Sequence, residues 1–190
     1  MEELIDVLDE DGKKTGIVKP KSLIKHDGDY HRAISICFMN LNNEILLQKR
    51  SGKKIIYPNL WSMFLKGHVR SGEDSISSAI RETKEELNLK IDARELLYLY
   101  TIKEEKIKTN YIEKIFFDTY LVLKNINFDS IILNDEVSDV IYINYQELKE
   151  MILNRDKRLI PNILDYEKII PILDSVIIEK GKSLNKNICE

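Results

Sequence analysis

Residues 67–89 read GHVRSGEDSISSAIRETKEELNL, and the second half of this stretch is crowded with acidic side chains. If that half is a helix, side chains three or four residues apart share one face. Glu82, Glu85 and Glu86 then gather on one side, and Arg81 pairs with Glu85 at the i, i+4 spacing. The spacing therefore predicts a helix with three carboxylates on one face.

Three carboxylates on one face repel one another unless a cation lies among them. Mg²⁺ prefers oxygen ligands and commonly bridges carboxylates to substrate phosphates. A solvated helix laced with ion pairs is the alternative, and on spacing alone it is the more common one. We expect Ile76, Ala79 and Ile80 to form a buried stripe on the same helix. Gly67 and Gly72 bound the preceding loop, where glycine would let carbonyls approach a site.

The whole stretch resembles the Nudix box, a motif that runs from a glycine through Glu and Arg-Glu to Glu-Glu and an apolar residue. Two positions depart from the pattern, since Thr83 replaces an aliphatic residue and Asn88 replaces a glycine. Asn tolerates the left-handed conformation at a helix end, and Thr still offers a methyl group to the core. The residues in register with the motif are Gly67, Glu73, Arg81, Glu82, Glu85, Glu86 and Leu89.

The resemblance implies a hydrolase that uses Mg²⁺ or Mn²⁺ to cleave a nucleoside diphosphate derivative or a similar small molecule. It also implies the fold, a Nudix-type α/β/α sandwich with a mixed sheet. By this resemblance Gly67 lends a backbone carbonyl to the metal, Arg81 orients the acids and Glu73 supports the network. The metal ligands that it implies are Glu82, Glu85 and Glu86, with Glu82 or a neighbouring carboxylate as general base. A further acid outside the box is expected, and Glu113 and Glu136 are the candidates.

Within this family, several segments resemble the branch related to isopentenyl diphosphate isomerase, among them residues 6–10, 31–33, 46–51 and 67–69. The isomerases protonate an alkene with a Cys and a Glu, but Lys66 stands at the cysteine position. Of the pair of acids in a later isomerase strand, the chain retains one, at Glu113. Isomerase activity is therefore disfavoured. A non-catalytic binding module is also disfavoured, because such proteins usually lose acids that this chain keeps.

Basic and histidine side chains are the remaining candidates for the site. We expect Arg32, Arg50 and Lys66 to bind phosphate oxygens. The isomerases bind a metal through histidines from comparable regions, and the three histidines of this chain are His26, His31 and His68. The sequence leaves open whether these three side chains meet.

Composition bounds the remaining possibilities. The chain has 190 residues, 43% of them hydrophobic and 32% charged, which is typical of a packed domain with a charged surface. A net charge of −3 gives no general attraction to nucleic acid. Cys37 and Cys189 are too few for a disulfide framework, and residues 1–4 lack the apolar core of a signal peptide. We expect a cytoplasmic protein with no membrane partner, as a monomer or homodimer that binds a small-molecule diphosphate.

Alternation of apolar residues predicts the remaining elements. We expect an N-terminal β-hairpin from residues 3–8 and 15–19, and then strands at residues 31–40, 44–50, 61–65, 96–102, 108–123 and 137–143. Helices are expected at residues 146–153 and 162–179, the latter interrupted by Pro171. The predicted organisation is a hairpin and connecting loop at 1–29, the main domain at 30–160, a helical extension at 161–180 and a frayed tail at 181–190.

Overall fold

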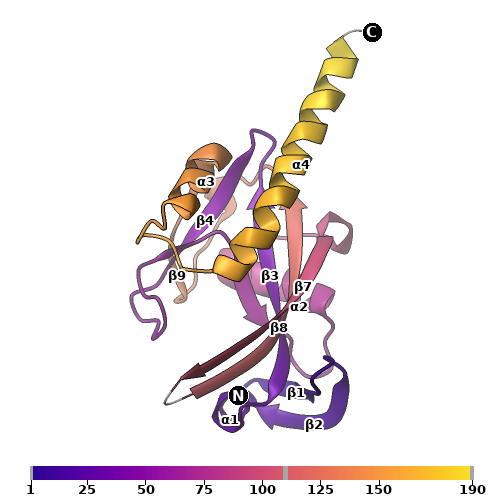
Figure 1. The fold of residues 1–190 in the computed structure, drawn as a ribbon, viewed down its shortest axis with the longest axis vertical. Coiled ribbons are helices and arrows are strands. Elements are labelled where there is room, and N and C mark those ends of the chain that lie inside the picture. Colours follow the sequence, from indigo (N-terminus) through magenta and orange to yellow (C-terminus); the bar gives the residue numbers. More distant parts are fainter. Residues whose placement is uncertain (1, 109–110, 189–190) are drawn as a thin grey trace.

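A computed structural model describes residues 2–108 and 111–188, and a mixed β-sheet runs through the middle of the molecule (Figure 1). The order β2-β1-β3-β4-β5 forms its main path, while β6 and β8 pair with β3, β7 pairs with β8, and β9 pairs with β4. The strands are β1 (Leu4–Leu8), β2 (Lys14–Pro20), β3 (Tyr30–Met39), β4 (Glu44–Arg50), β5 (Trp61–Ser62), β6 (Leu65–His68), β7 (Leu97–Lys108), β8 (Tyr111–Leu123) and β9 (Val137–Asn144). The helices are α1 (Lys21–Asp27), α2 (Ser75–Leu87), α3 (Tyr145–Leu153) and α4 (Ile163–Ile188), with short 3₁₀ turns η1 (Ala93–Glu95) and η2 (Phe128–Ser130).

Strand β3 lies at the centre of the sheet and carries apolar side chains on both faces, as the sequence predicts. Ile34, Ile36 and Phe38 pack in one buried cluster with residues of α2. Cys37 and Met39, which point to the other face, pack in a second cluster with residues of α3 and α4. The sheet is therefore covered by helices on both faces, which confirms the expected α/β/α sandwich.

The sheet opens where β3 and β4 diverge. These two strands pair in register only at Met39 with Ile45, whereas β3 pairs in parallel with β8 from Tyr30 to Met39. Beyond the divergence β6 pairs with β3, and β5 pairs with β4. This opening places the ends of β4, β5 and β6 around a common space, in which the functional site lies.

Helix α2 forms as the sequence predicts, and both of its ends are capped. The Asp74 carboxylate accepts a hydrogen bond of 2.7 Å from the backbone N–H of Ser77 at the start of the helix. Asn88 ends it in the left-handed conformation, with φ of 56°. The predicted apolar stripe is wrong in part: Ala79 is fully buried, but Ile76 is 40% exposed. The inward face instead includes Glu82 and Glu86, because a cavity rather than solid core lies beneath it.

The two ends of the chain lie at opposite ends of the molecule (Figure 1). β1 and β2 form the predicted antiparallel hairpin. At the other end, residues 181–188 continue helix α4, where the sequence predicts a frayed tail. The predicted interruption at Pro171 is wrong, because α4 continues through this residue. Proline removes one backbone hydrogen bond from a helix interior, but Ile169 and Leu173 on either side are fully buried in the core cluster. Strand β7 is longer than predicted, since it extends to Lys108, and β8 begins at Tyr111.

Among the described residues, none of the helices is both long enough and apolar enough to cross a membrane.

The thiol of Cys37 provides a test of the core. Its side chain is fully buried in the cluster shared with α3 and α4, and burial raises the pKa of the thiol to about 12. Cys189 falls outside the described residues. In the Cys189→Ser variant we expect no reaction with a thiol reagent such as dithionitrobenzoate until the protein unfolds. Stoichiometric labelling of the folded variant at neutral pH would contradict this packing.

Candidate active site

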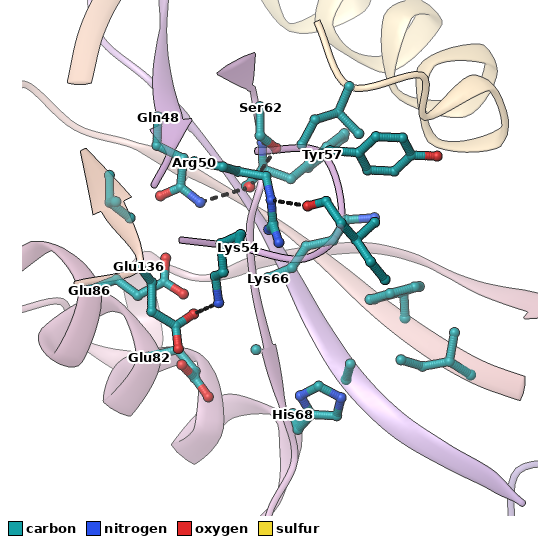
Figure 2. Close-up of a pocket in the computed structure, with 18 of the residues that line it drawn as sticks. Gln48, Arg50, Lys54, Tyr57, Ser62, Lys66, His68, Glu82, Glu86 and Glu136 are labelled. Carbon is teal, nitrogen blue, oxygen red and sulfur yellow. Dashed lines mark hydrogen bonds and ion pairs between the residues drawn. The ribbon is translucent and has the colours of Figure 1, made fainter. Parts of the chain in front are cut away.

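A cavity of about 460 Å³ lies where the sheet opens, and Glu82, Glu85 and Glu86 of the box line it, whereas Glu73 lines a second cavity. Its walls come from α2, from β4 to β6, from the β7–β8 hairpin and from the loop that follows β4. Figure 2 shows Glu82, Glu86 and Glu136 close together, with Lys54 reaching toward Glu136. The residues predicted for the site that line this cavity are Arg50, Lys66, Gly67, Glu82, Glu85, Glu86, Glu113 and Glu136.

Arg81 connects the acids of α2 to the strand below them. Its Nη1 donates to Glu82 at 2.7 Å and to Glu85 at 3.2 Å, the latter being the predicted i, i+4 pair. Its Nε and Nη2 bind Glu73 at 2.9–3.1 Å, and Nη2 also donates to the carbonyl of His68 at 2.9 Å. Burial alone would lower the pKa of this guanidinium, but hydrogen bonds to Glu73 and Glu82 outweigh burial and raise it. Arg81 is thus a permanent cation that fixes two acids of the site.

Position 67 requires glycine because a side chain there would collide with Glu82. The sequence prediction attributed this glycine to backbone freedom in a loop, and that reason is wrong. The residue lies within β6 and has no left-handed φ, unlike Gly72, whose φ is 86°. A Cβ at position 67 would lie 2.1 Å from Cδ of Glu82, far inside contact distance. The absence of a side chain therefore lets the Glu82 carboxylate lie directly over the backbone of β6.

Glu82 and Glu86 are carboxylates in a largely dry environment. Their exposed fractions are 8% and 5%. Burial raises the pKa of Glu82, and it raises the pKa of Glu86 to about 8, with the charges of Glu82 and Glu136 adding to the effect. Within the described part of the chain, Glu86 Oε2 is buried without a hydrogen-bond partner. A buried carboxylate oxygen of this kind is costly unless a proton or a cation approaches it.

Lys54 and Glu136 form an ion pair beside these acids (Figure 2). Lys54 lies in the loop after β4, and the backbone N–H of Ser51 donates to the carbonyl of Glu136 at 2.8 Å. The Glu136 side chain is 52% exposed, so it can turn within the cavity. Glu113 lines the cavity from β8. Both acids proposed from outside the box thus face the same space as the box acids.

The predicted phosphate-binding residues separate into two groups. Arg50 and Lys66 line the cavity, where Arg50 Nε donates to the carbonyl of Ile56 at 3.0 Å. Arg32 lies in a second cavity, where it binds Asp118 through Nη1 at 2.7 and 2.9 Å. The structure therefore does not bring Arg32 to the acids.

The three histidines do not meet. The rings of His31 and His68 stack with centroids 5.3 Å apart and an interplanar angle of 8°. His26 is exposed on α1, where its Nδ1 lies 2.9 Å from an oxygen of Asp27. Across residues 2–108 and 111–188, no group of three or more His, Cys, Asp or Glu side chains is arranged to hold a metal ion. Among the acids of the cavity, Glu82 and Glu85 are bound by Arg81, and Glu136 is bound by Lys54.

Sequence reasoning missed two residues at this site. Asp165, on α4, binds Lys66 Nζ at 2.6 Å from a position with no motif around it. Lys54 belongs to a basic loop, but its pairing with Glu136 depends on a contact between distant segments. The sequence signal at Asp165 is the apolar pattern around it, which predicts a packed helix. A charged residue in such a helix can be buried, as Asp165 is.

Comparison with known proteins agrees with the fold. The family model described as the NUDIX domain matches residues 29–163. The chain belongs to the Nudix hydrolase family.

Two curated relatives and one solved structure illustrate the similarity. The chain is 35% identical over 180 residues to Nudix hydrolase 3 of Arabidopsis thaliana, covering 90% of this chain but 23% of that protein, so it spans about a quarter of that relative. It is 22% identical over 181 residues to an isopentenyl-diphosphate Delta-isomerase of Cutibacterium acnes, covering 90% of this chain and 91% of the isomerase. The crystal structure of DR0079 from Deinococcus radiodurans superposes with a TM-score of 0.59 at 22% identity, covering 80% of this chain and 90% of that one.

Gly67→Ala tests the close approach of Glu82 to β6. The new Cβ would overlap the Glu82 carboxyl group, so Glu82 must leave its position and its bond to Arg81. We expect a loss of about 1–3 kcal/mol in the free energy of unfolding, which is typical of overpacking, together with loss of hydrolase activity. Chemical denaturation and an activity assay measure the two effects.

Gly181→Ala is the matched control, because nothing lies within 4 Å of a Cβ at that position. This control should keep wild-type activity. Wild-type activity in Gly67→Ala would show that Glu82 does not need its place over β6.

Proposed function

We propose that this Nudix hydrolase cleaves a diphosphate linkage in a nucleoside diphosphate derivative or a similar small molecule, with Mg²⁺ or Mn²⁺ held by Glu82, Glu85 and Glu86. The observation that carries the proposal is the buried Oε2 of Glu86, which has no hydrogen-bond partner within residues 2–108 and 111–188, beside the second buried carboxylate, Glu82. Two such acids are unfavourable side by side until a cation joins them.

The residues at this site fit a hard divalent cation. The available ligands are carboxylate oxygens, which Mg²⁺ and Mn²⁺ prefer over softer donors. Glu85 is 43% exposed in its side chain and Glu136 is 52% exposed, so both can turn from their cationic partners toward a metal. When bound, such a cation neutralises the diphosphate and lowers the pKa of a coordinated water.

The side chains of the chain itself account for the other requirements of diphosphate hydrolysis. Arg81 fixes the orientation of Glu82 through a bond of 2.7 Å. Arg50 and Lys66 provide positive charge in the cavity wall, where they can donate to phosphate oxygens. Glu82 or a neighbouring carboxylate is positioned to accept a proton from water. Phosphoryl chemistry depends mostly on such positioning and charge stabilisation.

Isomerase activity is the second candidate, favoured by the similarity to an isopentenyl-diphosphate isomerase along most of the chain. The site argues against it. Lys66 occupies the cysteine position and is bonded to Asp165, and Cys37 lies in the core cluster instead. A non-catalytic binding module is the third candidate, and the retained acids of α2 argue against that function.

Glu86→Gln tests the proposed metal site. The substitution keeps the size of the side chain and removes its charge, so hydrolysis of a diphosphate identified in a substrate screen should fall by several orders of magnitude. The melting temperature without metal should stay the same or rise, because burial already disfavours the ionised carboxylate. Steady-state hydrolysis and thermal melts with and without Mg²⁺ measure these effects.

Glu150→Gln, on an exposed position of α3, is the matched control and should behave as wild type in both assays. Near-wild-type turnover in Glu86→Gln, with an unchanged Mg²⁺-induced shift in melting, would remove Glu86 from the site.

The purified protein should not interconvert isopentenyl and dimethylallyl diphosphate. That reaction needs a protonating group on each face of the alkene, and Lys66 replaces the cysteine that the isomerases use. The measurement is an isomerase assay in the presence of Mg²⁺, with Lys66→Cys assayed beside the wild type. Turnover by the wild type that survives repeated purification would reverse the ranking of the two activities.

A further inference from the structure

A buried carboxylate of helix α4 contacts a lysine in the wall of the active-site cavity. Lys66 Nζ lies 2.6 Å from Asp165 Oδ2, which joins β6 to the first turn of α4. The same ammonium lies 4.1 Å from the ring centroid of Phe117 and 5.5 Å from that of Phe64. Lys66 and both aromatic rings line the cavity. The ammonium is therefore held between one carboxylate and two aromatic faces at the cavity surface.

Stability alone does not explain this ion pair. Asp165 is 5% exposed, and among the described residues its Oδ1 is buried without a hydrogen-bond partner. Burying two charges costs free energy that their attraction often fails to recover, and apolar pairs of similar size usually pack as well or better. An ion pair with an unsatisfied oxygen at the edge of a reaction cavity is better explained by a role in binding.

The backbone around Asp165 is fixed on both sides. Tyr166 Oη donates to the carbonyl of Ile160 at 2.7 Å, and Ile160 N donates to the carbonyl of Trp61 at 2.9 Å. Tyr100 Oη donates to the carbonyl of Asp165 itself at 3.4 Å. These bonds tie the start of α4 to the sheet, so the carboxylate of Asp165 has a defined position relative to β6.

We propose that Asp165 is a positioning residue that holds the Lys66 ammonium in place to bind a phosphate oxygen of the substrate. An ammonium has three donors, and Asp165 uses one of them, which leaves donors for the substrate. Without Asp165 the flexible lysine stem would let the ammonium move toward the carboxylates elsewhere in the cavity, such as Glu104 or Glu113. The substrate class in this proposal rests on the proposed function. Asp165 lies just beyond the residues that match the family model, which end at 163.

The test compares Asp165→Asn with Asp174→Asn. Asp174 lies on the same helix and binds Lys149 Nζ at 2.8 and 2.9 Å. Lys149, unlike Lys66, does not line the cavity, so the control breaks a matching ion pair of α4 away from the site. In Asp165→Asn we expect KM for the diphosphate substrate to rise about tenfold or more, as for loss of a charge-assisted contact, with kcat within about twofold. Asp174→Asn should keep the wild-type KM.

A second variant keeps the test valid if a single substitution unfolds the protein. Lys66→Met alone would leave Asp165 as an unpaired buried charge and is expected to be unstable. The double variant Lys66→Met/Asp165→Asn removes both charges, and its KM should rise at least as much as in Asp165→Asn. A wild-type KM in Asp165→Asn or in the double variant would overturn the proposal. So would an equal rise of KM in Asp174→Asn, or a fall of kcat with unchanged KM.

Direct binding separates this inference from the proposed function. Titration of the proteins with inorganic diphosphate and Mg²⁺ in a calorimeter should show weaker binding to Asp165→Asn than to wild type and Asp174→Asn. If the wild type binds diphosphate in this pattern but hydrolyses none of a panel of diphosphates, the proposed function fails and the role of Asp165 stands. If the wild type hydrolyses the panel but all variants bind diphosphate equally, the role of Asp165 fails and the proposed function stands.

Discussion

The bonds of the Arg81 guanidinium hold the site together. Arg81 binds Glu73 at the start of the α2 region, Glu82 in its middle and the carbonyl of His68 on β6. These contacts fix the helix over the strand, and the missing side chain of Gly67 lets Glu82 lie between them. A lysine could not replace this residue, because only the planar guanidinium presents several donors in fixed directions. The residues of the Nudix box therefore pack α2 against β6 as well as providing the acids of the site.

The opening of the sheet leaves a cavity beside this contact between α2 and β6. Because β3 and β4 pair in register at only one position, the strands beyond it surround a cavity rather than a continuous core. The inward face of α2 accordingly carries Glu82 and Glu86 where an ordinary amphipathic helix would carry apolar residues. Helix α4 packs on the opposite face from α2, and Asp165 in its first turn contacts Lys66 in the cavity wall. Fold and chemistry therefore depend on the same irregularity of the sheet.

Much of the fold could be predicted because local patterns determine it. The alternation of β3, the caps of α2 and the spacing of its acids are all readable from neighbouring residues. The role of Gly67 was harder to predict from the sequence, because it depends on the Glu82 side chain, fifteen residues further on, which lies over the strand. The position of Arg32 and the pairing of Lys66 with Asp165 depend on contacts between segments far apart in the sequence. A single sequence carries no signal for such contacts.

Cationic side chains balance part of the acidic charge of the cavity. Arg81 and Arg70 bind Glu85, and Lys54 binds Glu136. Each of these two acids is partly exposed and can exchange its partner at little cost. Glu82 and Glu86 are more deeply buried, and one oxygen of Glu86 has no hydrogen-bond partner among the described residues. The site thus combines two fixed carboxylates with two that can turn, an arrangement suited to admitting a cation together with an anionic substrate and releasing both after reaction.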